Sequence, residues 1–298
     1  MQALRLKAAI GDTVQVMPIW EQGADSDRLD FELVKVNPLH RAFRRMVRNL
    51  EFDLSEMPIA TLGQALMDGV PLYPLPIPAS ARFHHSSILC SIDSDIKSPA
   101  DLVGRRVAAR SWPQTSGVWI RGILQHDYGL DLRSIKWIVQ EGPHVERFSD
   151  PDYVVLDESD ESLLAMLAAG TVDAVTGLHG IPAGTRPVIA DADEAAAAWF
   201  ERTRIFPINH VVVIRKDLVD QHPWLPEEVT NVFSRAADVA RQRGDLASDR
   251  LGIGPGHDLY RIGLEENRAS MQMLVDFSIE QGILPAGADL DAIFKTNG

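Results

Sequence analysis

Two adjacent histidines, with an arginine two positions before the first, form the densest cluster of chemically useful side chains in the sequence. They lie in Ser80-Ala-Arg-Phe-His-His-Ser-Ser87, which follows a proline-rich stretch at residues 70–78. Histidine exchanges protons near neutral pH, and an arginine guanidinium pairs well with a carboxylate. In an extended segment neighbouring side chains point to opposite faces, so Arg82 and His84 should share one side and His85 the other. We therefore expect one of the two histidines to reach a given binding site.

A second candidate is an anion site within residues 104–124. This segment predicts a short strand from Arg106 to Arg110, a polar loop and the first turns of a helix. Thr115 or Ser116 can cap that helix, and the free N–H groups of the next turn, with Gly117 in it, then point into the loop. The positive end of the helix dipole lies behind them, so a carboxylate or phosphate can bind without a lysine. An ordinary capped helix has the same pattern, so the segment alone leaves both interpretations open.

Polar residues also follow or begin several predicted strands. Open α/β sheets bind ligands at the carboxyl ends of their strands, which makes such residues candidates for a site. The residues of this kind at strand ends are Asp12, Ser55, Glu56, Glu141 and His179. Asn209 and His210 stand instead at the start of a β-branched strand, residues 211–214.

The alternation of strands and helices through residue 215, followed by a helical tail, predicts an α/β protein with mostly parallel sheets. The polar strand ends fall into one set before residue 95 and another after it. Two sheets whose carboxyl ends face each other across a cleft would bring the two sets together. We expect a first lobe of residues 1–92 and 210–298, with the C-terminal helices, and a second lobe of residues 93–209.

Composition limits the class of ligand. The chain of 298 residues is 45% hydrophobic and 24% charged, which is ordinary for a globular protein with a sizeable core. Its formal net charge of −13 argues against nucleic acid and against an anionic membrane surface as partners. An anionic substrate would therefore need a locally positive pocket. The single cysteine, Cys90, lies in an apolar run and should be a small buried side chain.

The N-terminal ten residues alternate as a strand and lack the long apolar core and cleavage site of a secretory signal. No apolar run approaches the roughly 20 residues that span a bilayer. We therefore expect a cytoplasmic protein.

Two helix faces could contact another subunit. The helix after Pro38 carries four arginines on the face opposite its apolar stripe: Arg41, Arg44, Arg45 and Arg48. In the helix after Ser116, the apolar residues group on one face and place Arg121 opposite. We expect Arg121 to face solvent or another subunit, and a homo-oligomer is an open expectation.

Two segments resemble sequences typical of type II periplasmic binding proteins. Leu163-Leu-Ala-Met-Leu-Ala-Ala-Gly-Thr-Val-Asp-Ala174 resembles their L-x-x-G-x-(V/I)-D-A segment, and Ser98-Pro-Ala-Asp-Leu-Val-Gly-Arg-Arg-Val107 resembles the crossover into their second lobe. Within that superfamily, four further stretches resemble the 4,5-dihydroxyphthalate decarboxylase family: Phe52-Asp-Leu-Ser-Glu-Met57, Arg82-Phe-His-His-Ser86, Gly117-Val-Trp-Ile-Arg-Gly122, and Phe206-Pro-Ile-Asn-His210 with His222-Pro-Trp224. The likeness covers nearly the whole chain and implies a two-lobed fold, each lobe a mostly parallel sheet flanked by helices, with the ligand cleft between them.

The resemblance implies a carboxy-lyase of aromatic compound degradation, which removes carbon dioxide without oxidation from a hydroxylated aromatic dicarboxylate such as 4,5-dihydroxyphthalate. Such a site needs a base for the ring hydroxyl, an acid near the ring carbon and cationic partners for the carboxylate that stays. Our hypothesis assigns Arg82 and the helix N-terminus at Thr115 and Ser116 to the carboxylate. It assigns His84 or His85, together with His210, to proton transfer, and Glu56 to orienting a histidine or a hydroxyl.

Three alternatives remain open. A solute-binding protein could capture an aromatic acid or another small anion without changing it, and an enzyme of the same fold could act on another hydroxybenzoate or a heterocyclic acid. We expect no cofactor, although the histidines with Glu56 and Asp12 supply enough ligands to leave a divalent metal as a third alternative. None of these residues has the local spacing of a dedicated metal helix, so we assign no metal ligand.

Overall fold

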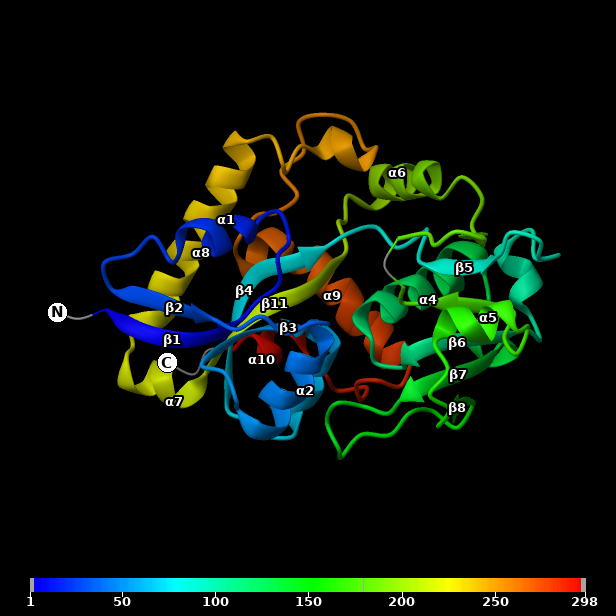
Figure 1. Ribbon diagram of the computed structural model, residues 1–298, viewed down its shortest axis with the longest axis horizontal. Coiled ribbons are helices and arrows are strands. Elements are labelled where there is room, and N and C mark those ends of the chain that lie inside the picture. Colours follow the sequence, from blue (N-terminus) through cyan, green and yellow to red (C-terminus); the bar gives the residue numbers. More distant parts are fainter. Residues whose placement is uncertain (1–2, 179, 296–298) are drawn as a thin grey trace.

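Two β-sheets lie side by side, each flanked by helices, in the computed structural model of the chain (Figure 1). The structure describes residues 3–178 and 180–295. The α/β class and the two-lobed arrangement predicted from the sequence are confirmed. Within the described part of the chain, no helix is both long and apolar enough to cross a membrane.

The first sheet has the strand order β2-β1-β3-β11-β4. Its strands are β1 (Leu4–Ala9), β2 (Leu29–Leu33), β3 (Leu54–Pro58), β4 (Leu72–Ala81) and β11 (Ile208–Arg215). β1 pairs in parallel with β2 and β3, whereas β11 runs antiparallel to both β3 and β4. The proline-rich β4 is an edge strand, as prolines without an N–H donor require.

The second sheet has the order β10-β5-β9-β6-β7-β8. Its strands are β5 (Ile88–Ser91), β6 (Arg106–Ser111), β7 (Lys136–Glu141), β8 (Val154–Leu156), β9 (Ala174–Thr176) and β10 (Thr185–Pro187). The chain thus changes sheets before residue 88, earlier than the expected boundary after residue 92. A turn at residues 84–87, closed by the hydrogen bond from Ser87 N–H to the His84 carbonyl (2.9 Å), precedes the apolar run at 88–91, which pairs with β9 and β10.

Helices cover both sheets and fill the space between them. Those that follow or pack with the first sheet are α1 (Met17–Gln22), α2 (His40–Asn49), α3 (Ile59–Met67), α7 (Lys216–Gln221), α8 (Leu225–Gln242), α9 (Leu264–Glu280) and α10 (Leu290–Ile293). The second sheet carries α4 (Thr115–Tyr128) and α5 (Leu163–Ala168), and α6 (Ala192–Thr203) lies on the return to the first sheet. One buried apolar cluster includes Met57, Leu62, Trp119, Trp137 and Leu274, so the core is continuous from one sheet to the other.

The C-terminal helix α9 packs on α4 of the second lobe. Gln281, just after α9, accepts a hydrogen bond on its backbone carbonyl from Trp112 Nε1 (2.9 Å), and its side-chain amide donates to the carbonyl of Val118 (2.9 Å). Gly122 faces the Phe277 ring so closely that an added Cβ would lie 2.1 Å from Cδ2 of that ring. The two lobes are therefore fastened to each other by the end of the chain.

The expectation that Arg121 faces solvent or another subunit is wrong. Its side chain is 0% exposed, and its guanidinium lies 3.7 Å from the Trp112 ring centroid. It donates to Gln281 Oε1 (2.8 Å) and to the carbonyl of Trp112 (2.6 Å). The face of α4 that points away from the second sheet is covered by α9, a partner that the periodicity of α4 alone cannot reveal.

Candidate functional site

Glu56 and His210 form a buried acid–base pair on neighbouring strands of the first sheet. Glu56 lies in β3 and is 1% exposed, while His210 lies near the start of the antiparallel strand β11. The carboxylate Oε1 accepts a hydrogen bond from His210 Nδ1 at 2.5 Å. Among the described residues, none bonds to His210 Nε2, which leaves that nitrogen for a ligand. A carboxylate that accepts from one ring nitrogen fixes the tautomer of the neutral imidazole and leaves the other nitrogen as an acceptor.

Glu56 is itself held by the end of β1. Its Oε2 accepts a hydrogen bond from the N–H of Gly11 at 2.8 Å. A Cβ at position 11 would lie 2.9 Å from that oxygen, so only glycine allows this approach. The Trp20 indole donates to the carbonyl of Gly11 (2.7 Å), and Phe43 packs edge-on to His210 at 5.0 Å between ring centroids. The pair is thus positioned by β1, α1 and α2 together.

Two other candidates on the same strands lie apart from this chemistry. Asp12, which follows Gly11, is exposed and makes no hydrogen bond within the described chain. Ser55 is buried and donates its hydroxyl to the backbone, to Glu56 O at 2.8 Å and Ala9 O at 3.3 Å. Its role in the structure is to join β1 to β3.

His84 and His85 point to different elements, but His85 lies in a turn, closed by the hydrogen bond from Ser87 N–H to the His84 carbonyl (2.9 Å), and not in the extended segment expected from the sequence. His84 is fully buried, with Nε2 2.8 Å from Asn209 Oδ1 and Nδ1 3.1 Å from the Ser87 hydroxyl. Both ring nitrogens are therefore engaged by protein. Burial, and next the charge of Arg82, lower the pKa of His84 well below its usual value. His84 and Asn209 thus tie together the two chain segments that cross between the lobes.

His85 differs from His84 because its Nδ1 is buried without a hydrogen-bond partner in the described chain. Its ring packs edge-on to Trp199 of α6, with 5.9 Å between centroids. Burial, with a contribution from the charge of Arg202, lowers its pKa to about 4. The imidazole is neutral near pH 7 and has a nitrogen free for a ligand.

Arg82 is a mostly buried cation without a carboxylate partner among the described residues. Its backbone N–H bonds to the carbonyl of Pro207 (3.0 Å), which fixes the chain at the crossover. Burial lowers the pKa of its guanidinium, although an arginine keeps its charge near neutral pH. A buried charge without a partner is costly, and an anionic ligand would remove that cost.

The N-terminus of α4 lies at the end of β6, but its cap differs from the expected one. The helix begins at Thr115, its N-cap is Gln114, and no side chain caps it. Thr115 and Ser116 are inside the first turn, so the expectation that either of them serves as the cap is wrong. Together with Gly117 they are buried, and their N–H groups have no intrahelical acceptor.

Three hydroxyls at this helix end are buried and lack a hydrogen-bond partner in the described chain: those of Ser111, Thr115 and Thr176. Thr176 pairs with Ala109 in the sheet, and Ser111 lies two residues farther along β6, so both point to the same face. Ala109 packs in the cluster that contains Trp119 of α4, which identifies this as the α4 face. Buried hydroxyls are rarely left without a partner, so this end of α4 offers free hydrogen-bonding groups to a polar ligand.

Ser111 and Thr176 were absent from the sequence-based candidates, although each ends its strand. A polar residue at a strand end is the same signal that identified the other candidates. The sequence does not show, however, that the ends of β6 and β9 lie side by side. The candidate His179 lies outside the described residues.

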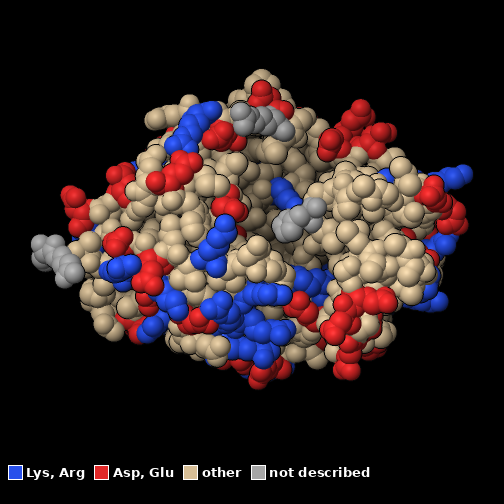
Figure 2. Space-filling view, viewed as in Figure 1, with Lys and Arg blue, Asp and Glu red and all other residues tan. Residues whose placement is uncertain are grey.

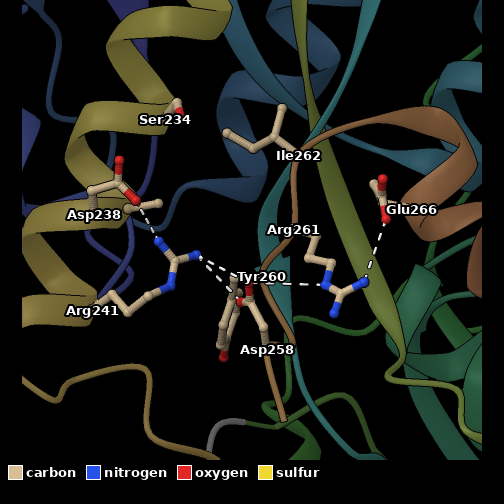
Figure 3. A pocket seen from close by; sticks show the side chains of 9 residues that line it. Ser234, Asp238, Arg241, Asp258, Tyr260, Arg261, Ile262 and Glu266 are labelled. Carbon is tan, nitrogen blue, oxygen red and sulfur yellow. Dashed lines mark hydrogen bonds and ion pairs between the residues drawn. The ribbon is translucent and has the colours of Figure 1, made fainter. Parts of the chain in front are cut away.

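Figure 2 shows a hollow in the middle of the face between the lobes, with Lys and Arg side chains gathered below it over α2. A cavity of about 500 Å³ lies elsewhere, between α8 and the start of α9 (Figure 3). Its arginines are already paired, Arg241 with Asp238 and Asp258, and Arg261 with Asp258 and Glu266. The N-terminal end of α4, with its free hydroxyls, and the unpaired Arg82 are therefore better candidates for a site than this cavity.

A metal was an open alternative. Among the described residues no three His, Cys, Asp or Glu side chains lie close enough together to hold a metal ion. We therefore assign no residue to a metal.

The buried histidines predict that the free energy of unfolding decreases as the pH falls below about 6.5, the pKa of histidine in an unfolded chain. Burial lowers the pKa of His85 to about 4 and that of His144 to about 3. Between these values and about 6.5 the unfolded state binds more protons, so stability present above this range is lost as the pH falls through it. Urea unfolding at a series of pH values measures the effect. The variant His144→Gln should show a flatter dependence, and one as steep as wild type would contradict this account.

Comparisons of the sequence with known proteins find two relatives of the same name. A scan against protein-family models finds no match. A 4,5-dihydroxyphthalate decarboxylase from Comamonas testosteroni is 30% identical over 294 residues, covering 90% of this chain and 89% of that protein. A protein of the same name from Pseudomonas putida is 28% identical over 214 residues, covering 67% of this chain and 83% of that protein.

Solved structures with similar folds have much lower sequence identity. The desulfurization enzyme DSZB matches with a TM-score of 0.58 and 16% identity, covering 99% of this chain and 96% of that one. The periplasmic aliphatic sulphonate binding protein SsuA from Escherichia coli matches with a TM-score of 0.57 and 17% identity, covering 99% of this chain and all of its own. The fold is therefore that of periplasmic binding proteins, as expected.

Proposed function

Because this chain belongs to the 4,5-dihydroxyphthalate decarboxylase family, we propose that it removes carbon dioxide from a hydroxylated aromatic dicarboxylate such as 4,5-dihydroxyphthalate. The single observation that carries the proposal beyond the family is the pair of Glu56 and His210 in the same lobe as the unpaired Arg82. A base with a free ring nitrogen and a cation for a carboxylate are the groups that this reaction needs.

The reaction begins at the ring hydroxyl para to the carboxylate that leaves. His210 takes the hydroxyl proton at Nε2, and the Glu56 carboxylate stabilises the imidazolium through Nδ1. The oxyanion pushes its electron pair toward the ring carbon that bears the carboxylate, which then accepts a proton. The electron pair of the bond to the carboxylate returns to the ring as carbon dioxide leaves, and the oxygen regains its proton.

We assign the proton for the ring carbon to His85 rather than His84. Both nitrogens of His84 are engaged by protein, whereas His85 Nδ1 has no partner among the described residues. The pKa of His85, about 4, describes the site without a ligand. A bound dianion raises that pKa because an opposite charge nearby favours the imidazolium.

We assign the carboxylate that stays to Arg82 and the N-terminus of α4. The guanidinium supplies charge, while the N–H groups of Thr115, Ser116 and Gly117 supply donors without a competing acceptor. The neighbouring hydroxyls of Ser111 and Thr176 would complete the cradle.

Carbon dioxide release from a panel of hydroxylated benzoates and phthalates tests the function. We expect release from 4,5-dihydroxyphthalate and none from phthalate, which lacks the hydroxyl that activates the ring. If no member of the panel releases carbon dioxide, the decarboxylase proposal fails.

The fold of periplasmic binding proteins favours a second candidate, a protein that captures an aromatic acid without changing it. Equilibrium dialysis with 4,5-dihydroxyphthalate, followed by mass analysis, separates the two functions. A binding protein returns the acid intact, whereas the decarboxylase returns 3,4-dihydroxybenzoate.

The variant Thr176→Val tests the cradle. Valine keeps the shape of threonine but removes a hydroxyl that has no partner in the described protein, so the free energy of unfolding should not decrease. Loss of a hydrogen bond to a carboxylate should weaken phthalate binding by about 10- to 100-fold. Calorimetry with phthalate measures the affinity. Thr203→Val is the control. It makes the same substitution at a hydroxyl that already donates to a protein partner, the carbonyl of Trp199 in α6. Equal affinity in wild type and Thr176→Val would remove Thr176 from the site.

We also propose that the protein works in the cytoplasm and that it forms a homo-oligomer. The exposed Arg41 and Arg48 of α2 support the homo-oligomer. Cell fractionation and light scattering of the purified protein test the two points separately.

A further inference from the structure

Arg121 reaches back along α4 and places its guanidinium beside the first turn of the helix. Side chains on a helix lean toward its N-terminus, and Nη2 of Arg121 donates to the carbonyl of Trp112 (2.6 Å), which precedes the helix. Its Nη1 lies against the backbone of Gly117, where an added Cβ would be only 2.7 Å from that nitrogen. The guanidinium therefore flanks the helix end at which the N–H groups of residues 115–117 have no intrahelical acceptor.

Gln281 and Trp112 fix this guanidinium in place. Its Nε donates to Gln281 Oε1 (2.8 Å), and the Gln281 amide donates in turn to the carbonyl of Val118 (2.9 Å). The Trp112 ring lies over the guanidinium, 3.7 Å from it to the ring centroid, and the Trp112 indole donates to the Gln281 carbonyl (2.9 Å). The end of β6, the start of α4 and the end of α9 are thus joined around one cation.

The charge of Arg121 has no counter-ion in direct contact. The side chain is fully buried, it forms no ion pair with a described carboxylate, and its Nη1 has no hydrogen-bond partner in the described chain. Burial lowers the pKa of Arg121 to about 9, and the charges of Asp150 and Tyr153 oppose this in part. The guanidinium therefore stays charged near pH 7, at a cost in free energy that an anionic ligand nearby would reduce.

A carboxylate bound at the start of α4 would lie close to Arg121. An oxygen that accepts from the Gly117 N–H would be within about 9 Å of Arg121 Nη1, given ordinary bond and hydrogen-bond lengths between the two. A cation at that distance in a protein interior attracts an anion without touching it, by an amount that corresponds to about tenfold in affinity or more. The unpartnered hydroxyls of Ser111, Thr115 and Thr176 lie at the same end of the helix and point independently to a polar ligand.

Building on the proposed function, we propose that Arg121 is a positioning residue that supplies positive charge to the carboxylate bound at the start of α4, and that Gln281 holds it there. Arg121 does not touch the substrate. The N–H groups of the first turn make the hydrogen bonds, and the guanidinium beside them adds the full charge that these neutral donors lack. Arg82 is then the cation of the first lobe and Arg121 the cation of the second, and the ligand is an aromatic acid with an ionised carboxylate.

Two substitutions of Arg121 separate its charge from its place in the scaffold. Arg121→Met and Arg121→Lys both lose the hydrogen bonds of the guanidinium to Gln281 and Trp112, but only lysine keeps a positive charge. We expect Arg121→Met to bind phthalate about tenfold or more weakly than wild type, and Arg121→Lys to recover a large part of that loss. Calorimetry with phthalate at pH 6.5, which favours protonated lysine, measures the affinities, and urea unfolding shows whether each variant is folded.

Arg105→Met is the matched control, because it removes the same charge from the surface of the same lobe. Arg105 pairs with Asp95 and lies about 20 Å of extended strand from the end of β6, so the phthalate affinity should stay within about twofold of wild type. Gly117→Ala decides the question if neither Arg121 variant folds. The added Cβ displaces Nη1 from the first turn and leaves every N–H donor in place, so phthalate binding should weaken.

The proposal is overturned if Arg121→Met binds phthalate as tightly as wild type, or if Arg121→Lys binds it no better than Arg121→Met, which is the result expected of a purely structural arginine. Where Gly117→Ala has to replace these variants, a wild-type affinity overturns the proposal as well. These titrations need no turnover. A wild-type protein that binds phthalate but releases no carbon dioxide from 4,5-dihydroxyphthalate would therefore refute the decarboxylase proposal alone.

Discussion

Replacement of His210 by alanine is expected to lower kcat for carbon dioxide release by about 10²- to 10⁴-fold, the usual contribution of a general base. His210 is the described histidine that pairs with a buried carboxylate and keeps a free nitrogen, whereas burial holds His84, His85 and His144 neutral. Without His210, no other described residue is assigned to take the hydroxyl proton. The affinity for phthalate, which has no hydroxyl, should change little. Initial rates of carbon dioxide release and calorimetry with phthalate measure the two effects.

His126→Ala is the control for this prediction. His126 also pairs with a glutamate, Glu280, at 2.7 Å, but that pair is at the surface. Its loss should leave kcat unchanged. The kcat of Glu56→Gln should lie between those of His210→Ala and wild type, because the amide no longer stabilises the imidazolium of His210. A His210→Ala protein with wild-type kcat would show that the base is elsewhere.

Replacement of Gly122 by alanine is expected to lower the free energy of unfolding by about 3 kcal/mol, at the upper end of the usual effect of overpacking a core. The added Cβ would lie 2.1, 2.3 and 2.5 Å from three atoms of the Phe277 ring, so α4 and α9 must move apart. Since α9 also carries the contacts of Gln281 to the second lobe, that movement should weaken these too. Urea unfolding followed by circular dichroism measures the loss.

Two variants make this result specific to the helix contact. Gly287→Ala is the control, because a Cβ there has no atom within 4 Å and should leave stability nearly unchanged. A smaller side chain opposite the new methyl group, as in Gly122→Ala with Phe277→Leu, should recover part of the loss. Equal stability of Gly122→Ala and wild type would mean that α4 and α9 are not packed as described.

The sequence predicted the features that depend on local pattern. Alternating strands and helices indicated the α/β class, and polar residues at strand ends indicated Glu56 and the start of α4 as candidates. The prolines in residues 70–78 predict an edge segment or a rigid connector, because proline cannot donate in a central strand, and these residues lie in and around the edge strand β4. These predictions needed no knowledge of which segments meet.

Features that depend on contacts between distant segments were not predicted. Arg121 is buried because α9 returns to cover α4, and the pairing of β5 with the second sheet is decided by β9 and β10. The roles of His84 and His85 separate only when Asn209 and Trp199 are placed beside them.

The hydrogen bonds of Gln281 also have a consequence for synthesis of the chain on the ribosome. The strands of the second sheet and the helix α4 are all complete by residue 187, yet Trp112 and Arg121 find their partner only at residue 281. Until that residue emerges, an apolar face of α4 is left uncovered, and so is Arg121, which is buried in the complete protein. Domains generally fold as units during synthesis, but here the middle lobe reaches its final packing only after nearly the whole chain has been made.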